Sequence, residues 1–159
     1  MKLYAIIRVR GTVDVSPKVE STLKHFRLHR KFHCTLYPST LPGIKGMLKV
    51  IEGWATWGEI NRETLIELLR RRGRTPGNKR LTDDYVNEKL GLKGGIEELA
   101  DKLLSGEIML HRIDKVLKPV FRLHPPKKGF KGSIKKMYKA GGELGYRGSD
   151  INELLKRMI

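Results

Sequence analysis

The stretch LYAIIRV, residues 3–9, decides how the first part of the chain folds. All of its side chains except that of Arg8 are apolar or aromatic, and the run is closed by Gly11. A short apolar run of this length, rich in β-branched residues and bounded by charged residues and a glycine, is typical of a buried β-strand. We therefore predict a strand over residues 3–9, against which the elements that follow must pack.

Helix and strand signals alternate after this run. Ser16 can cap a helix that has Pro17 in its first turn, and apolar residues then recur three and four positions apart. Residues 33–37, HCTLY, predict a second strand, residues 41–51 a short second helix, and residues 54–57 a third strand. The order strand, helix, strand, helix, strand predicts an α+β fold in the form of a compact α/β sandwich.

The middle of the chain, residues 59–117, is predicted to be helical. Asn61 can cap a first helix, which ends in the basic run of residues 70–73, RRRG. Thr82 can start a second helix, and the apolar spacing within residues 96–106 indicates a third that is closed by a glycine.

The last part of the chain contains its most unusual segment, residues 124–148, HPPKKGFKGSIKKMYKAGGELGYRG, which we call the basic arm. It holds six glycines, six lysines and a single acid, and no apolar period of 2 or 3.6 runs through it. We predict a strand at residues 120–123 before the arm, and a final helix after it that Ser149 and Asp150 cap. The arm cannot form a core, so we expect it to be extended and anchored to the body by the final helix.

The charge is segregated along the chain. The formal net charge is +16, with 33 basic and 17 acidic residues, and nearly all of the excess lies before residue 59 and after residue 114. We expect one compact domain with extensions: a sandwich core at residues 1–58, a helical extension at residues 59–117, and a strand, arm and terminal helix at residues 118–159. So large a positive charge repels itself unless a polyanion neutralises it, which makes nucleic acid the leading partner class.

The cellular setting follows from what the sequence contains. Cys34 is the single cysteine, so no intramolecular disulfide can form, which favours a reducing compartment. No apolar run reaches the ~18 residues of a membrane span, and none has the form of a secretion signal. We expect a cytoplasmic protein without a membrane partner.

Motifs for metal, nucleotide and catalytic sites are weak. Residues 25–34, HFRLHRKFHC, place histidines four apart near Cys34, but three cations crowd the group and no carboxylate is near. Residues 73–79, GRTPGNK, have one residue too few between the glycines for a phosphate-binding loop of the Walker type, and follow a helix instead of a strand. Residues 141–148, GGELGYRG, lack the strand that precedes a dinucleotide fingerprint. We expect no metal, no cofactor, no small-molecule substrate and no enzymatic activity.

The composition of the basic arm instead suits RNA. Glycine permits close backbone approach, lysine neutralises phosphates, and Phe130, Tyr138 and Tyr146 offer flat faces for unpaired bases. The arm would then extend across folded RNA. The alternative is a solvated loop whose aromatic side chains only pin it to the body.

Three stretches resemble the large-subunit ribosomal protein family L-thirty, in the long form found in archaea and related to the eukaryotic protein L-seven. They are LKHFRLHRKFHC at residues 23–34, TWGEINRETLIELLRRRGRTPGNKRLTDDYV at residues 56–86, and FRLHPPKKGFKGSIKKMYKAGGELGYRG at residues 121–148. The resemblance covers essentially the whole chain, whereas short bacterial members resemble only its first block. It implies a small α/β sandwich in a structural component of the large ribosomal subunit, without catalytic activity.

The resemblance also implies the partners: large-subunit ribosomal RNA, a position near the 5S RNA, and neighbouring ribosomal proteins. We expect most contacts to be made to phosphates, through counterion release. The residues that we assign to RNA contact are Arg27, His29, Arg30, Lys31, Arg71, Arg72, Arg74, Lys79, Arg80, Arg122, His124, Lys127, Lys128, Lys131, Lys135, Lys136, Lys139, Tyr146 and Arg147.

Two other classes of protein would share the charge. A basic chromatin protein would bind duplex DNA, and an RNA-processing or assembly factor would bind RNA. The first should keep its duplex DNA in the presence of structured RNA, and an enzyme of the second kind should depend on a catalytic base or metal cluster.

Overall fold

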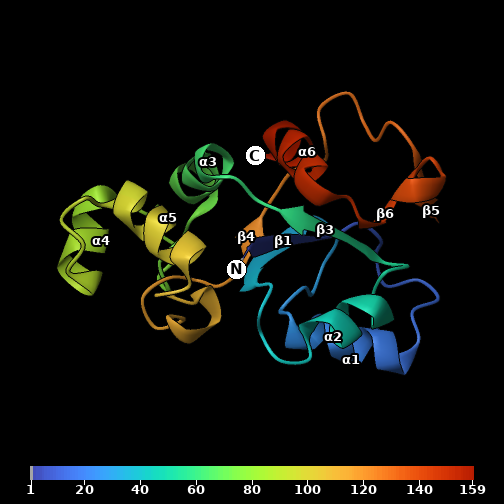
Figure 1. The fold of residues 1–159 in the computed structure, drawn as a ribbon, viewed down its shortest axis with the longest axis horizontal. Helices are drawn as coiled ribbons and strands as arrows, with labels where there is room; N and C mark the ends of the chain where they lie inside the picture. Colours follow the sequence, from blue (N-terminus) through green and yellow to red (C-terminus); the bar gives the residue numbers. More distant parts are fainter. Residues whose placement is uncertain (1) are drawn as a thin grey trace.

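The computed structural model describes residues 2–159 and shows a mixed sheet with helices on both faces (Figure 1). The strands lie in the order β4-β2-β1-β3-β6-β5. Their bounds are β1 Leu3–Arg8, β2 His33–Pro38, β3 Ala55–Glu59, β4 Phe121–Arg122, β5 Ser133–Met137 and β6 Gly142–Tyr146. The helices are α1 Pro17–His25, α2 Ile44–Val50, α3 Arg62–Arg72, α4 Asp83–Leu90, α5 Ile96–Ser105 and α6 Ile151–Met158. This architecture confirms the predicted α+β class.

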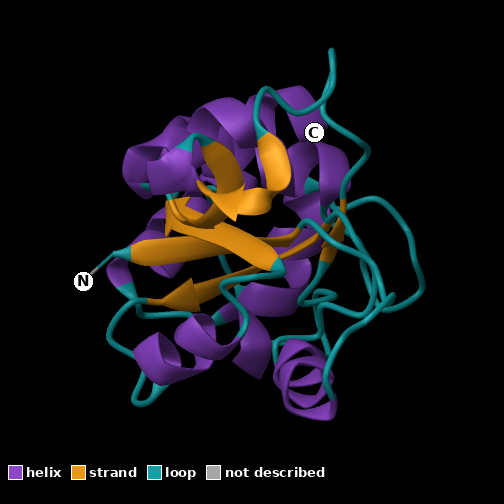
Figure 2. Ribbon diagram, turned by 90° about the vertical axis from the view of Figure 1, so that its right-hand side faces the viewer, coloured by secondary structure: helices purple, strands orange, loops and turns teal. Residues whose placement is uncertain are grey.

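Strand β1 lies between two hydrophobic clusters. Leu3, Ala5 and Ile7 belong to the cluster that α3, α5 and α6 cover, whereas Ile6 faces the opposite cluster under α1 and α2. Figure 2 shows the strands between helices above and below. Because successive side chains of a strand point to opposite faces, a strand buried on both sides must be apolar nearly throughout. This requirement explains the continuous apolar run at residues 3–9.

The predicted helix starts are present in the structure. The hydroxyl oxygen of Ser16 accepts a hydrogen bond from the Val19 amide at 3.3 Å, and the side-chain oxygens of Asn61 and Thr82 make the equivalent bonds for α3 and α4. Each side chain satisfies an amide that the helix itself leaves unpaired.

The predicted cap of the last helix is wrong. Asp150 precedes α6 but makes no capping hydrogen bond, and a short 3₁₀ turn over Gly148–Asp150 leads into the helix instead. The Asp150 carboxylate accepts a hydrogen bond from the Tyr138 hydroxyl, which ties the basic arm to the start of α6. A side chain used in this way is not available to the helix amides.

The basic arm crosses from one edge of the sheet to the other. It leaves β4 at the first edge, and its backbone passes the end of α6, where the His124 and Lys127 amides donate to the carbonyls of Met158 and Arg157. It then forms β5 and β6, two strands that the sequence did not predict, and β6 pairs in parallel with β3. The division into residues 1–58, 59–117 and 118–159 stays a prediction, but strands of the first and last parts share one sheet.

The close packing of β3 against the turn before α6 depends on Gly58. A Cβ atom at this position would overlap the carbonyl oxygen of Gly148 and lie 3.0 Å from the Cβ of Ile151. Gly58→Ala should therefore lower the free energy of unfolding by about 1–3 kcal/mol or more, because backbone and helix would have to move apart. Guanidinium unfolding followed by circular dichroism measures this change.

Gly46→Ala provides the matched control for that experiment. Gly46 lies inside α2, and a Cβ there meets nothing within 4 Å. The substitution should stabilise the protein by about 0.5–1 kcal/mol, because alanine loses less entropy in a helix. Equal effects of the two substitutions would contradict the packing described for β3.

Candidate nucleic-acid interface

The first predicted group lies in the turn between α1 and β2. His29, Arg30 and Lys31 are exposed there, whereas Arg27 is half-buried with its guanidinium 3.6 Å from the Asp114 carboxylate. Two apolar residues of the turn, Phe26 and Leu28, are buried, so that its polar residues remain at the surface. Three of the four residues are therefore placed where a polyanion can reach them.

The histidines near Cys34 do not form a metal site. Cys34 is fully buried in β2, and this burial raises the pKa of its thiol. Among residues 2–159, no group of three or more histidine, cysteine or acidic side chains is placed to hold a metal ion. No helix in the same range is long and apolar enough to cross a membrane.

The lysines of the basic arm are all exposed. Within this group, Lys131 lies 3.2 Å from the Glu153 carboxylate, and it is the one arm lysine for which the described residues provide an acidic partner. The exposed members are Lys127, Lys128, Lys131, Lys135, Lys136 and Lys139. The arm therefore presents a row of ammonium groups to solvent along its path over the protein.

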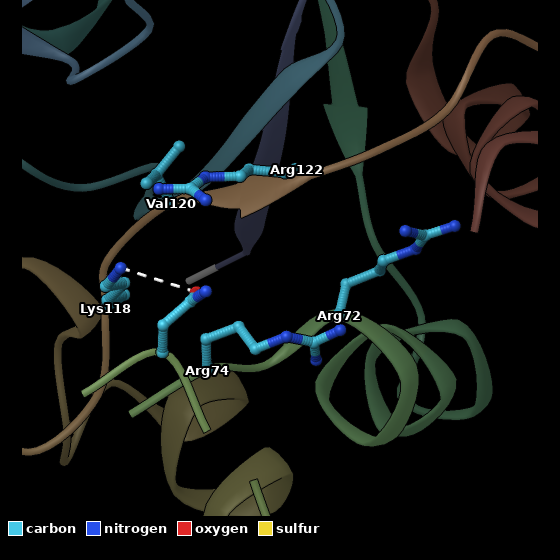
Figure 3. A pocket seen from close by; sticks show the side chains of 6 residues that line it. Arg72, Arg74, Lys118, Val120 and Arg122 are labelled. Atoms are coloured by element: carbon cyan, nitrogen blue, oxygen red, sulfur yellow. Dashed lines mark hydrogen bonds between the residues drawn. The ribbon is translucent and has the colours of Figure 1, made fainter. Parts of the chain in front are cut away.

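A cavity of about 210 Å³ joins residues from two separate predicted groups (Figure 3). Arg72, Arg74 and Asn78 come from the end of α3 and the loop that follows, while Lys118 and Arg122 come from the chain that leads into β4. Thr35 in β2 holds the second segment in place, because its hydroxyl donates to the Pro119 carbonyl at 2.9 Å. We call this cavity the cationic pocket; Val120 completes its lining.

The lining of the cationic pocket contains four positive side chains and no acid. Partial burial lowers the pKa of Arg72, and the positive charges of Arg74 and Arg71 lower it further. Because the cations of the pocket lie near one another and no carboxylate compensates their charge, the pocket attracts anions.

Lys118 is a pocket residue that the sequence assignment did not include. Lys118, Val120 and Arg122 alternate along the chain, and side chains two apart in an extended segment lie on the same side. From this spacing, Lys118 could have been assigned to RNA contact together with Arg122. The meeting of both with Arg72 and Arg74 is not visible in the sequence, because it depends on where β4 pairs.

Arg147, which the sequence assigns to RNA contact, is bonded inside the protein. Its side chain is buried, and its guanidinium donates to the Glu143 carboxylate at 2.7 Å, to the Glu143 carbonyl at 2.6 Å and to the Thr56 hydroxyl at 2.9 Å. Glu143 in turn accepts from the Gly132 amide. The arginine therefore fastens β6 to β3 through two of the three nitrogens of its guanidinium group.

Two other assigned residues are partly occupied within the protein. An imidazole nitrogen of His124 lies 2.9 Å from the Ile159 carbonyl oxygen, and the Tyr146 hydroxyl donates to the Glu59 carboxylate. The Tyr146 ring is 41% exposed and meets Tyr4 edge-on. The residue is therefore partly exposed to solvent, whereas its hydroxyl is used inside the protein.

Comparison with known proteins decides the family. The family described as "Ribosomal protein L30p/L7e" matches residues 4–54. The chain is 72% identical over 165 residues to the large ribosomal subunit protein uL30 of Hyperthermus butylicus, covering 100% of this chain and 91% of the relative. It is 61% identical to uL30 of Staphylothermus marinus, over 99% and 98% of the two chains, and 56% identical to uL30 of Aeropyrum pernix, over 100% of both. The chain belongs to the uL30 family of large ribosomal subunit proteins.

The uL30 relatives extend over the parts of the chain that the family match at residues 4–54 does not reach. The helical middle and the basic arm are thus shared with the full-length archaeal proteins. The uL30 family is structural and non-enzymatic, which agrees with the expected absence of a catalytic group.

Replacing Arg147 tests its structural role. Arg147→Gln should lower the free energy of unfolding by about 3–5 kcal/mol, because the buried Glu143 carboxylate would lose its cation. Urea unfolding measures this loss. The exposed Arg112 gives a control, since Arg112→Gln should change stability by no more than about 0.5 kcal/mol. Unchanged stability together with weaker RNA binding in Arg147→Gln would restore Arg147 as a contact residue.

The bond between Tyr146 and Glu59 gives a prediction in alkali. The hydrogen bond to Glu59 is the main cause that raises the pKa of Tyr146 to about 12, with burial and the negative charge of Glu59 adding to it. The folded-state pKa exceeds the ordinary value of about 10, so the stability this bond contributes is present below pH ~10 and lost as the pH approaches ~12.

Glu59→Gln should bring the pKa of Tyr146 back toward its ordinary value. The ring carbon shifts of ¹³C-labelled tyrosine, followed by NMR against pH, report the change, and the signal missing from Tyr146→Phe identifies the residue. A pKa that stays near 12 in Glu59→Gln would show that the carboxylate is not the cause.

Proposed function

We propose that this uL30 chain binds large-subunit ribosomal RNA and stabilises its folded form. The observation that carries the proposal is the placement of the cations: the arm lysines, the turn after α1 and the cationic pocket all lie at the surface. Each cation that meets a phosphate releases condensed counterions, so the free energy of binding comes from many weak, sequence-independent contacts. Such contacts position a protein on folded RNA without reading its bases.

The proposal excludes Arg147, which is bonded inside the protein, and adds Lys118 from the pocket. The remaining assigned residues stay in the proposed contact set. Tyr146 would contribute through its partly exposed ring, on which an unpaired base can stack.

The setting of this function follows from the family. Membership of uL30 places the chain on the ribosome in the cytoplasm. We further propose that it lies near the 5S RNA and touches neighbouring ribosomal proteins, as the family resemblance implies. No membrane, cofactor or small-molecule substrate takes part.

The salt dependence of RNA binding tests the role of the basic arm. Binding of the full chain to large-subunit ribosomal RNA transcribed in vitro is measured over a range of potassium chloride concentrations. Replacing Lys127, Lys128, Lys131, Lys135, Lys136 and Lys139 together by Gln should flatten the slope of log K against log [salt] by up to about 4–5, because each lost phosphate contact removes about 0.7–0.9.

A control with the same change in charge uses six lysines that are not assigned to RNA contact. Lys18, Lys24, Lys45, Lys49, Lys89 and Lys93 are all exposed, and none belongs to the proposed contact set. Their replacement by Gln should alter the slope much less. Equal flattening in the two variants would show that total charge, and not the arm, governs binding.

Sedimentation of lysate through sucrose separates the proposed function from its rivals. The protein should travel with large subunits at moderate salt and leave them at high salt, because the contacts are electrostatic. A protein that stays at the top of the gradient, or that follows genomic DNA, would contradict the proposal.

A further inference from the structure

The cationic pocket has the properties of a site for a single anionic group. Its four cations, Arg72, Arg74, Lys118 and Arg122, come from two segments of the chain that line one cavity, and no acidic side chain lines it. Some surface cations of this protein pair with carboxylates, as Arg62 does with Asp101 at 2.7 Å. Among the ion pairs of residues 2–159, none involves a pocket cation. The positive charge of the pocket is therefore not neutralised by the protein.

The loop that forms one wall of the pocket is held rigidly. The Thr75 amide donates to the Lys79 carbonyl and the Asn78 amide to the Thr75 carbonyl, both at 2.8 Å, and Thr75 is buried. Gly73 packs so closely on the last turn of α3 that an added Cβ would overlap the Leu69 carbonyl oxygen. The loop thus has its conformation before any ligand arrives, which lowers the entropy cost of binding.

The pocket side chains differ in how far the protein fixes them. One guanidinium nitrogen of Arg74 donates to the carbonyls of Gly73 at 2.9 Å and Arg71 at 3.2 Å, and the Lys118 ammonium lies 3.5 Å from the Asn78 side-chain oxygen. No side-chain hydrogen bond to another described residue is made by Arg72 or Arg122. These two guanidinium groups keep all their donors for a ligand.

We infer that the cationic pocket binds one phosphate group of the RNA backbone. Arginine presents a planar set of donors that matches phosphate oxygens, and lysine adds a point charge, so the pocket offers both kinds of contact. The exposed Arg71 in the last turn of α3, with Lys79 and Arg80 on the loop that follows, extends the positive surface beyond the pocket, which suits a continuing RNA strand better than an isolated ion. The inference rests on the proposed RNA binding and assigns it a specific anchoring point.

Occupation of the pocket would also bridge two parts of the structure. The loop after α3 and the segment before β4 are joined by the hydrogen bond from the Lys118 amide to the Arg74 carbonyl at 2.9 Å. A phosphate held by side chains from both segments adds a second link at the same place. Binding to RNA should therefore raise the stability of this junction as well as position the protein.

The test compares two double variants with the same change in composition and charge. Lys118→Gln with Arg122→Gln removes the pocket cations of the β4 segment, and Lys93→Gln with Arg112→Gln removes exposed cations outside it. Circular dichroism melts establish that both are folded. Binding to in vitro transcribed large-subunit ribosomal RNA is then measured over the same range of salt.

The pocket variant should bind RNA about 10- to 100-fold more weakly at moderate salt, with a slope flattened by about 0.7–0.9, as expected for one lost phosphate with charge-assisted hydrogen bonds. The control should bind like the original protein. Equal binding by the two variants, while the original protein binds RNA, overturns the pocket inference and leaves the proposed function intact. Failure of the original protein to bind RNA overturns both.

Titration of the full chain with inorganic phosphate gives a readout that needs no RNA. The side-chain NH signals of Arg72 and Arg122, observed by NMR at slightly acidic pH, should shift with phosphate and not with chloride at equal ionic strength. The shifts should be absent in the pocket variant for the residue that remains, Arg72. Equal responses to the two salts would mean that the pocket only screens charge, and would overturn the inference.

Discussion

The burial of the central sheet on both faces is the constraint from which the rest of this structure follows. Ile6 on one side of β1 and Ala5 and Ile7 on the other are completely buried, so helices must cover both faces. A chain with a net charge of +16 then has no sheet face on which to place its cations. The cations other than the buried Arg8 and Arg147 lie at the sheet edges, in the loops and on the outer sides of helices, and this is where the structure places the arm lysines and the cationic pocket.

Local signals were sufficient to predict the first three strands and the first five helices. The reason is that caps such as Ser16 and Asn61 and the continuous apolar run of β1 act within a few residues. Strands β5 and β6 could not be predicted in this way. The exposed residues of β5 carry no apolar pattern, and β6 is a strand because it pairs with β3, more than 80 residues earlier in the sequence. Two hydrogen bonds support this pairing. The Thr56 hydroxyl donates to the Gly145 carbonyl, and the Arg147 side chain donates to the Thr56 hydroxyl.

The candidate site also has one part that the sequence predicts and one part that depends on tertiary structure. Exposure of the arm lysines follows from composition, because a segment rich in lysine and glycine with few apolar residues has little to bury. The pocket depends on tertiary structure: β4 pairs with β2 through Cys34 and Phe121, and this pairing carries Lys118 and Arg122 to the end of α3. The internal bonds of Arg147 also depend on tertiary structure. Its neighbours in sequence are those of a basic arm, whereas its neighbours in space are Glu143 and Thr56.

Hydrogen-bond acceptors separate structural arginines from those that are left for a ligand. Buried Arg8 donates to the carbonyls of Leu28, Arg10 and Gly11, and buried Arg147 donates to Thr56 and Glu143. Burying a guanidinium without such partners would be prohibitively costly, so each buried arginine has been given its acceptors by the fold. Arg72 and Arg122 lie at the surface among other cations, where mutual repulsion opposes their gathering. A bound anion makes this arrangement favourable. The phosphodiester backbone of RNA carries many such charges and can neutralise the pocket, its loop and the arm together.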